Sequence, residues 1–171
     1  RQWIREGKEY GFGELETKAS CTEPLTSLIN PDAPEFVPSG DIPERIRQFC
    51  RKTRQPVPQS EGEIVCCIDQ SLARAYRKAM DEIRACTGKQ YPVIHLIGGG
   101  AQSGLLCQMT ANACGLPVVA GPVEATVYGN TMAQFMALGE LNGLAQARRA
   151  LADTLHTVVY EPRDREIWEE A

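Results

Sequence analysis

Apolar residues recur at intervals of three and four over residues 62–86, which is the spacing of one face of an α-helix. Ser60 and Glu63 precede this run with a hydroxyl three residues before a carboxylate, the spacing of an N-terminal capping box. Gly88 follows it, at the position where helices commonly end. The pattern predicts one long amphipathic helix, with Asp69 on its solvent-exposed side.

Shorter helical patterns flank this segment. Helices are predicted over residues 3–7, 14–19, 41–53, 103–114, the stretch that follows Glu124, and 144–151. Asp41 is expected to cap the third of them, with Pro43 in its first turn, where a proline costs no hydrogen bond. Small residues after Glu124 predict a helix that packs closely against its neighbours. Residues 161–171 are predicted to form a loose polar tail.

Two short runs, residues 93–97 and 117–120, are rich in β-branched residues and lack helical periodicity. The alternation of helices and strands predicts that these strands are parallel, joined by a right-handed crossover, with helices on both faces. We expect the first strand to be buried, with His95 as a hydrogen-bonded core residue. Because two parallel strands are too few for a stable sheet, we expect further strands from a missing N-terminal part or from a partner.

The length and composition fit one compact globular domain. The chain has 171 residues, 43% of them hydrophobic, and no run approaches the roughly 18 apolar residues that span a membrane. It does not open with a signal peptide, so we expect a cytoplasmic protein. A net charge of −4 argues against nucleic-acid or anionic-membrane partners. The basic cluster of Arg45, Arg47, Arg51, Lys52 and Arg54 is interpreted as a solvated helix face.

The sequence does not indicate a metal-binding site. The seven cysteines lack metal-ligand spacing, and only two histidines are present, so we interpret the cysteines as reduced thiols, mostly in the core. Glu124 stands at a predicted helix start, where a carboxylate more often interacts with the helix dipole than acts as a catalyst.

The most informative segment is residues 98–103, Gly-Gly-Gly-Ala-Gln-Ser, called here the glycine turn. Glycines let a ligand lie against the backbone, and the N–H groups that open the following helix carry partial positive charge. A nucleotide is the usual occupant, and a ligand-free packing turn is the alternative. The turn lacks the lysine of a P-loop and the pattern of a nucleophile elbow. An NAD site stays open as an alternative, although no acidic residue ends the next strand.

The stretch 94–118, which includes IGGGAQSG, resembles the adenosine-binding motif in the C-terminal domain of the FGGY carbohydrate kinases. Further segments resemble the members of that family that act on rhamnulose. These segments are residues 27–32, 50–53, 55–58, 71–73, 120–126, 129–130 and 137–140. The resemblance extends from about residue 3 to residue 162, nearly the whole chain.

This resemblance implies an actin-like ATPase fold, in which two ribonuclease-H-like domains close on ATP-Mg²⁺ and a sugar. The implied reaction transfers the γ-phosphoryl group to the 1-hydroxyl of L-rhamnulose. The chain would be a partial ribonuclease-H-like α/β domain whose N-terminal strands are missing. It would have an irregular or helical excursion at 1–60, a nucleotide-binding part at 61–160 and a polar tail at 161–171. The family's catalytic aspartate and phosphate-binding loop have no counterpart here, so we expect this piece alone to be inactive.

By position, the resemblance implies that Gly99, Gly100, Ala101, Gln102 and Ser103 contact the nucleotide, mainly through the backbone. It implies no catalytic or metal-binding residue within the chain, so the Mg²⁺ site is expected elsewhere. A kinase acting on fuculose or xylulose, or a non-catalytic actin-like nucleotide-binding module, is the alternative.

Two further expectations follow from the resemblance. Related kinases can carry cysteines at the positions of Cys50 and Cys67, so these thiols can lie close together, and in a reducing cytoplasm we expect them to stay unpaired. The strand edge left open by the missing strands predicts a dimer or larger oligomer.

Overall fold

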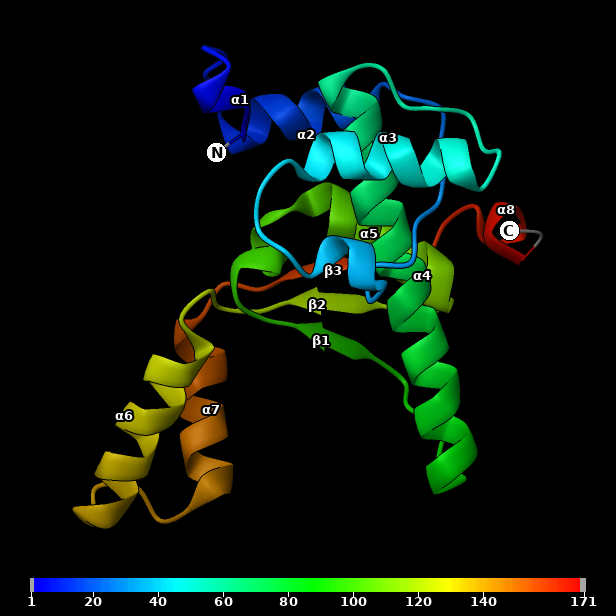
Figure 1. The fold of residues 1–171 in the computed structure, drawn as a ribbon. Coiled ribbons are helices and arrows are strands. Elements are labelled where there is room, and N and C mark those ends of the chain that lie inside the picture. The colour runs from blue at the N-terminus through cyan, green and yellow to red at the C-terminus, as the bar shows by residue number, and fades with distance from the viewer. Residues whose placement is uncertain (1, 170–171) are drawn as a thin grey trace.

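The computed structural model describes residues 2–169, which form a small mixed sheet and several helices (Figure 1). The helices are α1 (Gln2–Arg5), α2 (Phe12–Ser20), α3 (Ile42–Lys52), α4 (Glu61–Thr87), α5 (Gly104–Cys114), α6 (Ala125–Ala137), α7 (Leu144–Thr154) and α8 (Arg165–Glu169), with short 3-10 helices η1 (Pro34–Phe36) and η2 (Gly99–Gln102). The strands are β1 (Ile94–Leu96), β2 (Val118–Ala120) and β3 (Val158–Tyr160). Residue 1 and residues 170–171, parts of the predicted segments 1–60 and 161–171, lie outside the described residues.

Helix α4 is the central support of the fold. The predicted capping box is confirmed, because the Glu63 backbone N–H donates to the Ser60 side chain while the Glu63 carboxylate accepts from the Ser60 backbone, and the helix ends at Gly88 with a φ of 66°. At Gly62 a side-chain carbon would lie 2.6 Å from the carbonyl oxygen of Lys18. Only glycine permits this close crossing of α2 over the start of α4.

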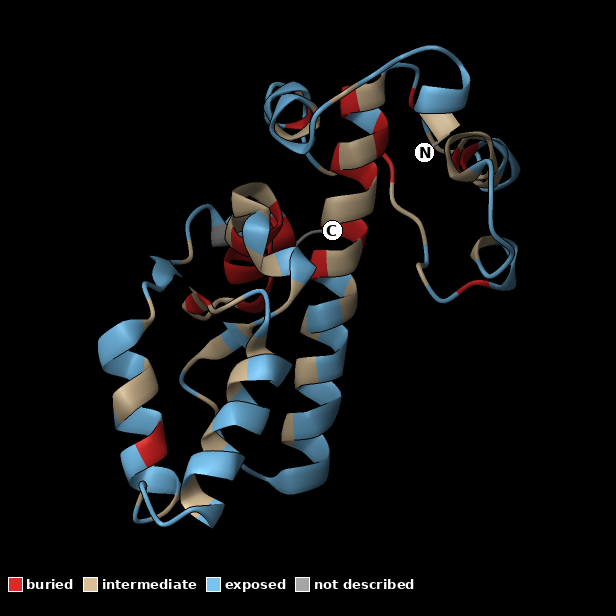
Figure 2. Ribbon diagram, turned by 90° about the vertical axis from the view of Figure 1, so that its left-hand side faces the viewer, coloured by how far each residue is buried: buried red, intermediate tan, exposed pale blue. Residues whose placement is uncertain are grey.

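The core consists of three clusters that meet around α4 and α5. One joins α2, α4, α5 and α8 through Ala19, Cys66, Ala73, Met109, Ala113 and Trp168. A second joins α3 to α4 through Ile46, Cys50, Ile64 and Cys67. A third joins α5 to the sheet through Cys107, Ala111, Val118 and Ala120. Burial is concentrated on α5 and the first half of α4, whereas α6, α7 and the second half of α4 are mostly exposed (Figure 2).

The sheet has the order β1-β2-β3. Strands β1 and β2 are parallel, with Ile94 opposite Val118, as the sequence predicts. The third strand was not predicted; β3 pairs antiparallel with β2, with Val118 opposite Tyr160. The sheet is therefore mixed.

The expectation that helices cover both faces of the sheet is wrong for residues 2–169. Helix α5 packs against the face that carries Ile94 and Val118. His95, Val119 and Val159 lie in register on the other face, where His95 is exposed and Val159 is 54% exposed. The predictions of a buried first strand and a core histidine are therefore corrected, because β1 is an edge strand covered on one side.

The capping role predicted for Asp41 is also wrong. Asp41 has a left-handed φ of 46° and makes no side-chain cap hydrogen bond to α3. A cap accepts from the second or third helical N–H, and Pro43 stands at the second position, where it has no N–H to donate. Pro43 itself does lie in the first turn, as predicted.

The C-terminal third differs from expectation in two places. Helix α6 has no buried residue and packs against α7 as a peripheral hairpin, so its small residues do not bring it close to the core (Figure 1). Within the stretch predicted as a polar tail, α8 buries Trp168, which is 5% exposed, and the Arg77 guanidinium donates to the Trp168 carbonyl at 2.6 Å. Among residues 2–169, no helix combines the length and apolar character that crossing a bilayer requires.

Candidate functional site

The glycine turn connects the carboxyl end of β1 to α5. Gly98 adopts a φ of 79°, which favours glycine, and its N–H donates to the carbonyl of Pro122 at 3.2 Å. Inside the turn, Ala101 N–H donates to Gly98 and Ser103 N–H donates to Gly100, at 3.1 and 3.2 Å. The turn is thus a short 3-10 segment fixed beside the loop that leaves β2.

The turn presents its backbone to solvent. Gly99, Gly100 and Gln102 are exposed, whereas Ala101 and Ser103 are half-buried. A side-chain carbon at Gly99 would meet no atom within 4 Å. In open α/β sheets, ligands bind outside the carboxyl ends of the parallel strands, which is where this open backbone lies.

Apolar side chains are exposed on the two segments that meet at the turn. Ile97, which precedes the turn, is 57% exposed, and Val123, which follows Pro122, is 40% exposed. Gly121 directly follows β2 and its N–H donates to the Leu96 carbonyl at 2.8 Å; a side-chain carbon at Gly121 would lie 3.0 Å from the Ile97 side chain. Exposed backbone beside apolar side chains suits a flat, partly apolar group such as a nucleotide base.

The start of α5 is held by protein groups, contrary to the prediction that its N–H groups are free for a ligand. The Ser103 hydroxyl accepts from the Leu106 N–H at 3.1 Å. The Glu16 carboxylate accepts from the Leu105 N–H at 2.6 Å, and the same oxygen lies 3.5 Å from the Ser103 hydroxyl. Negative charge is therefore already present at this helix terminus.

A second carboxylate lies near Glu16. Asp69 is half-buried on α4, so its predicted place on the solvent-exposed side is wrong. Among residues 2–169 the Asp69 side chain has no hydrogen-bond partner. Burial and, to a smaller extent, the negative charge of Glu16 together raise the pKa of Asp69 to about 6.

Tyr160 completes this group behind the first turn of α5. A side-chain carbon at Gly104 would lie 3.2 Å from the Tyr160 hydroxyl and 3.4 Å from the Glu16 carboxylate. Burial, with added repulsion from Cys107 and Glu16, raises the pKa of Tyr160. Four segments, α2, α4, α5 and β3, thus converge behind the glycine turn, and no local sequence pattern signals this.

The other features considered for a functional role, Glu124 and possible metal ligands, receive less support from the structure. Glu124 is exposed at the N-cap position of α6 and makes no side-chain cap hydrogen bond. Within the described part of the chain, no group of three His, Cys, Asp or Glu side chains is arranged to hold a metal ion.

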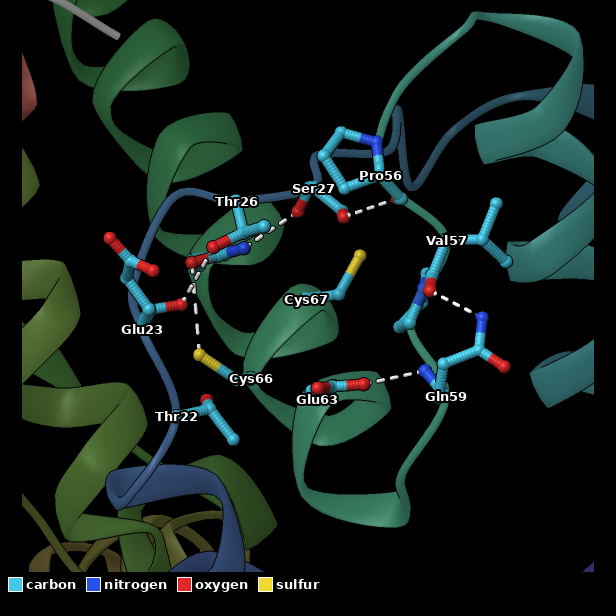
Figure 3. A pocket seen from close by; sticks show the side chains of 12 residues that line it. Thr22, Glu23, Thr26, Ser27, Pro56, Val57, Gln59, Glu63, Cys66 and Cys67 are labelled. Carbon is cyan, nitrogen blue, oxygen red and sulfur yellow. Dashed lines mark hydrogen bonds between the residues drawn. The ribbon is translucent and has the colours of Figure 1, made fainter.

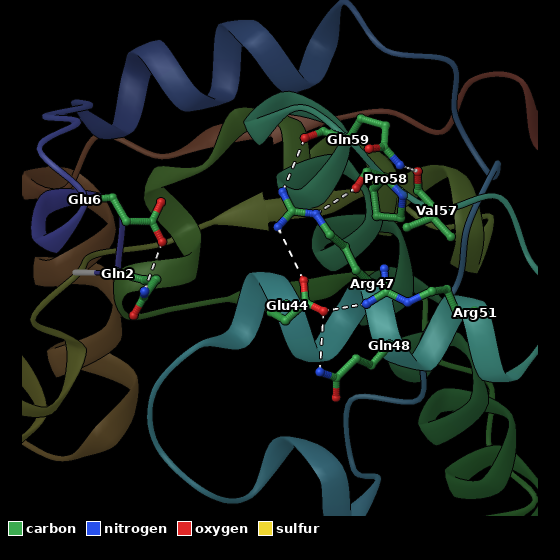
Figure 4. Close-up of polar contacts among 9 residues, drawn as sticks. All are labelled: Gln2, Glu6, Glu44, Arg47, Gln48, Arg51, Val57, Pro58 and Gln59. Atoms are coloured by element: carbon green, nitrogen blue, oxygen red, sulfur yellow. Dashed lines mark hydrogen bonds and ion pairs between the residues drawn. The ribbon is translucent and has the colours of Figure 1, made fainter.

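The basic cluster on α3 is largely engaged in contacts within the protein (Figure 4). Arg47 donates to the carbonyls of Pro58 and Gln59, at 3.1 and 3.2 Å, and Arg51 pairs with Glu44. The interpretation as a solvated face therefore holds for the exposed Arg51, but Arg47 is half-buried and ties α3 to the loop before α4.

A cavity of about 190 Å³ lies between the 22–27 loop, residues 56–59 and α4 (Figure 3). Its wall is built by buried Gln70, which accepts from the Leu25 N–H at 2.5 Å and donates to the Ser27 carbonyl at 2.6 Å. Ligand pockets usually measure about 300–1,000 Å³. This cavity is smaller, and its polar atoms fix the loop, so the glycine turn is the better candidate.

The seven cysteines are all free thiols, which agrees with the expectation that Cys50 and Cys67 stay unpaired. Both residues are buried in the α3–α4 cluster. Burial raises the pKa of the Cys67 thiol to about 12, so it stays protonated at neutral pH.

Comparison with known proteins agrees with the resemblance seen in the sequence. Residues 1–138 match the family model for the FGGY family of carbohydrate kinases, C-terminal domain. Over 174 residues the chain is 42% identical to a rhamnulokinase of Bacteroides thetaiotaomicron, with 99% of the chain and 36% of that protein covered. Over 156 residues it is 36% identical to a rhamnulokinase of Bacillus subtilis, with 91% of the chain and 32% of that protein covered.

The chain spans about a third of the length of these curated relatives. Its matched residues include the glycine turn and the helices that support it. The chain belongs to the FGGY family of carbohydrate kinases.

Proposed function

We propose that this chain is the C-terminal, nucleotide-binding portion of a cytoplasmic sugar kinase that transfers the γ-phosphoryl group of ATP to the 1-hydroxyl of L-rhamnulose. The observation that carries this proposal is the open glycine turn at the carboxyl ends of two parallel strands, in a chain of a carbohydrate-kinase family. The names of the two matched relatives support rhamnulose as the sugar.

In this proposal the backbone of Gly99 and Gly100 forms a wall against the adenosine, and Ala101, Gln102 and Ser103 border it. Gly99 has the open space that such contact needs. The Ser103 hydroxyl caps α5, so Ser103 contributes its backbone rather than its side chain. The exposed Ile97 offers an apolar surface beside the base.

The charge at the start of α5 bears on how the nucleotide is oriented. The Glu16 carboxylate accepts from the Leu105 N–H, and the Ser103 hydroxyl accepts from the Leu106 N–H. The negative charge of Glu16 repels phosphate from this helix start. We therefore place the adenosine end over the glycine turn and the phosphates away from α5. Mg²⁺ neutralises charge on the phosphate oxygens in such kinases. Residues 2–169 contain no three-residue metal cluster, so no step is assigned to a metal held by this chain.

Phosphoryl transfer depends mainly on positioning and charge neutralisation. The contribution of this chain is to bind and orient the nucleotide, while the catalytic base and the sugar contacts lie in other parts of the kinase. We further propose that residues 1–60 form a helical excursion and residues 61–160 the nucleotide-binding part of an incomplete ribonuclease-H-like, actin-like domain. The edge of β1 and its exposed face would then be covered by the rest of the kinase, or by a second copy when the chain is isolated.

A coupled kinase assay tests the proposal. The full-length protein is assayed with ATP-Mg²⁺ and, separately, L-rhamnulose, L-fuculose and D-xylulose. We expect ATP-dependent turnover with a clear preference for L-rhamnulose, and none from the 171-residue chain alone. Equal turnover of the three sugars would contradict the rhamnulose assignment, and absence of turnover with each of them would contradict the kinase assignment.

A further inference from the structure

We propose that Glu16 is a positioning residue for the nucleotide: from α2 it holds the first turn of α5, and through Ser103 it fixes the glycine turn where the adenosine binds. This inference rests on the proposed function, because it concerns the same turn.

The contact joins parts of the chain that are 89 residues apart. One oxygen of Glu16 accepts from the Leu105 N–H at 2.6 Å and lies 3.5 Å from the Ser103 hydroxyl. A hydrogen bond to an ionised carboxylate is stronger than one between neutral groups. Glu16 therefore ties α2 directly to the point where the turn becomes a helix.

Ser103 transmits this restraint to the turn. Its hydroxyl caps Leu106 on the helical side, and its backbone N–H donates to the Gly100 carbonyl on the turn side. Within the turn, the Ala101 N–H donates to the Gly98 carbonyl. A shift of Ser103 consequently moves the backbone that the nucleotide would contact.

The need to satisfy the first backbone N–H groups of α5 does not by itself explain why position 16 carries a glutamate. The Ser103 hydroxyl already satisfies one N–H of the first turn, and water can satisfy others at a partly exposed helix end. The Glu16 carboxylate also lies near Asp69, whose negative charge repels it, and beside the Tyr160 hydroxyl. The hydrogen bond between Glu16 and the Leu105 N–H is present despite this repulsion, which agrees with a role of Glu16 in positioning the glycine turn.

The variants separate the reach of the side chain from its charge. Glu16→Gln keeps an oxygen at the same distance without the charge, whereas Glu16→Asp keeps the charge on a side chain one methylene shorter. Glu16→Ala removes both. Glu14→Gln is the matched control. Glu14 lies on the same helix and is exposed, and its carboxylate oxygen lies 3.9 Å from the Lys18 ammonium nitrogen.

Steady-state kinetics of the full-length kinase, with ATP and sugar varied separately, provide the test. We expect Glu16→Ala and Glu16→Asp to raise the KM for ATP about tenfold while the KM for the sugar stays within twofold, since only the nucleotide contact moves. Glu16→Gln should restore most of the ATP affinity, and Glu14→Gln should behave like the unaltered enzyme. If Glu16→Ala does not fold, the comparison of Glu16→Asp with Glu16→Gln carries the test.

The two proposals fail in different ways. If the unaltered enzyme phosphorylates a sugar with ATP but Glu16→Asp and Glu16→Ala keep its KM for ATP, losing only thermal stability, Glu16 is merely structural and the inference is overturned. An unaltered enzyme that neither binds ATP nor transfers phosphate overturns the proposed function, and the inference with it.

Discussion

Replacing Asp69 by asparagine is expected to stabilise the protein above pH 6 and to change its stability only slightly near pH 4. Burial and the nearby Glu16 raise the pKa of Asp69 from an ordinary value of 3.8 to about 6. Between these values the folded protein binds more protons than the unfolded chain, so the contribution of Asp69 lowers stability as the pH rises. Well below pH 3.8 the carboxyl is protonated in both states and its destabilising effect disappears, and at pH 4 only a small part of that effect remains.

The size of the effect follows from the change in pKa. Raising a carboxyl pKa from 3.8 to about 6 corresponds to about 3 kcal/mol at pH 7. Solvent reaches part of the Asp69 side chain and screens its charge, so we expect about 1–2 kcal/mol. Asparagine has nearly the same shape as aspartate but no charge, so Asp69→Asn should recover most of this lost free energy of unfolding.

Urea unfolding of the protein and of Asp69→Asn between pH 4 and 7.5 measures the difference. If the free energy of unfolding falls by about 2 kcal/mol per molar urea, the unfolding midpoint of the variant should lie about 0.5–1 M higher at pH 7 and nearly coincide with that of the unaltered protein at pH 4. A second measurement uses Glu16→Gln as background. Because the charge of Glu16 contributes to the raised pKa of Asp69, the gain from Asp69→Asn should shrink there. Equal midpoints at pH 7, or the same displacement at pH 4 and 7, would refute the reasoning.

Two further predictions concern packing and thiol reactivity. Gly62→Ala should destabilise the protein by about 1–3 kcal/mol in urea unfolding, because the added carbon would lie 2.6 Å from a backbone oxygen of α2, whereas Gly13→Ala, with no atom within 4 Å, should be neutral or slightly stabilising. A destabilised Gly13→Ala and an unaffected Gly62→Ala would show that the two helices do not cross closely. Brief alkylation of the native protein at pH 8, read by mass spectrometry, should modify Cys21 and Cys86, which are exposed, and spare the five buried thiols. Rapid labelling of Cys67 would contradict its burial.

Local sequence patterns predicted the elements whose signals lie within a few residues. The capping box at Ser60 and Glu63 and the left-handed Gly88 after α4 depend on backbone geometry that neighbouring residues determine. The parallel pairing of β1 and β2 also followed from the order of elements, because a helix joins the two strands.

The wrong or missing predictions mostly concern structure that depends on contacts between residues far apart in the sequence. Strand β3 has only three residues, too few to show a period, and it becomes a strand by pairing with β2. His95 was expected in the core because alternation along a strand does not reveal which face of the sheet a helix covers. Asp41 has the residue type of a cap, but its left-handed backbone and the proline at the second helical position prevent that hydrogen bond.

The candidate site was predicted in part. The exposed backbone at Gly99 is what a glycine-rich turn after a strand indicates. The carboxylate of Glu16 at the start of α5 could not be foreseen, since 89 residues separate it from Leu105 and no spacing rule connects them. This long-range contact places a carboxylate at the helix start, which supports the proposal that the adenosine end rather than the phosphates lies over the turn.

Calorimetric titration of the full-length protein and its Gly99→Ala variant with ATP tests the central claim, that the nucleotide lies against the backbone of the glycine turn. The added methyl group meets no protein atom within 4 Å, so the fold should be kept and only a bound ligand should be displaced. Gly13→Ala, equally free of contacts, is the control. We predict that Gly99→Ala weakens ATP binding about tenfold, about 1.4 kcal/mol, at an unchanged unfolding midpoint, while Gly13→Ala binds normally. ATP binding of equal strength by the unaltered protein and Gly99→Ala would contradict the account.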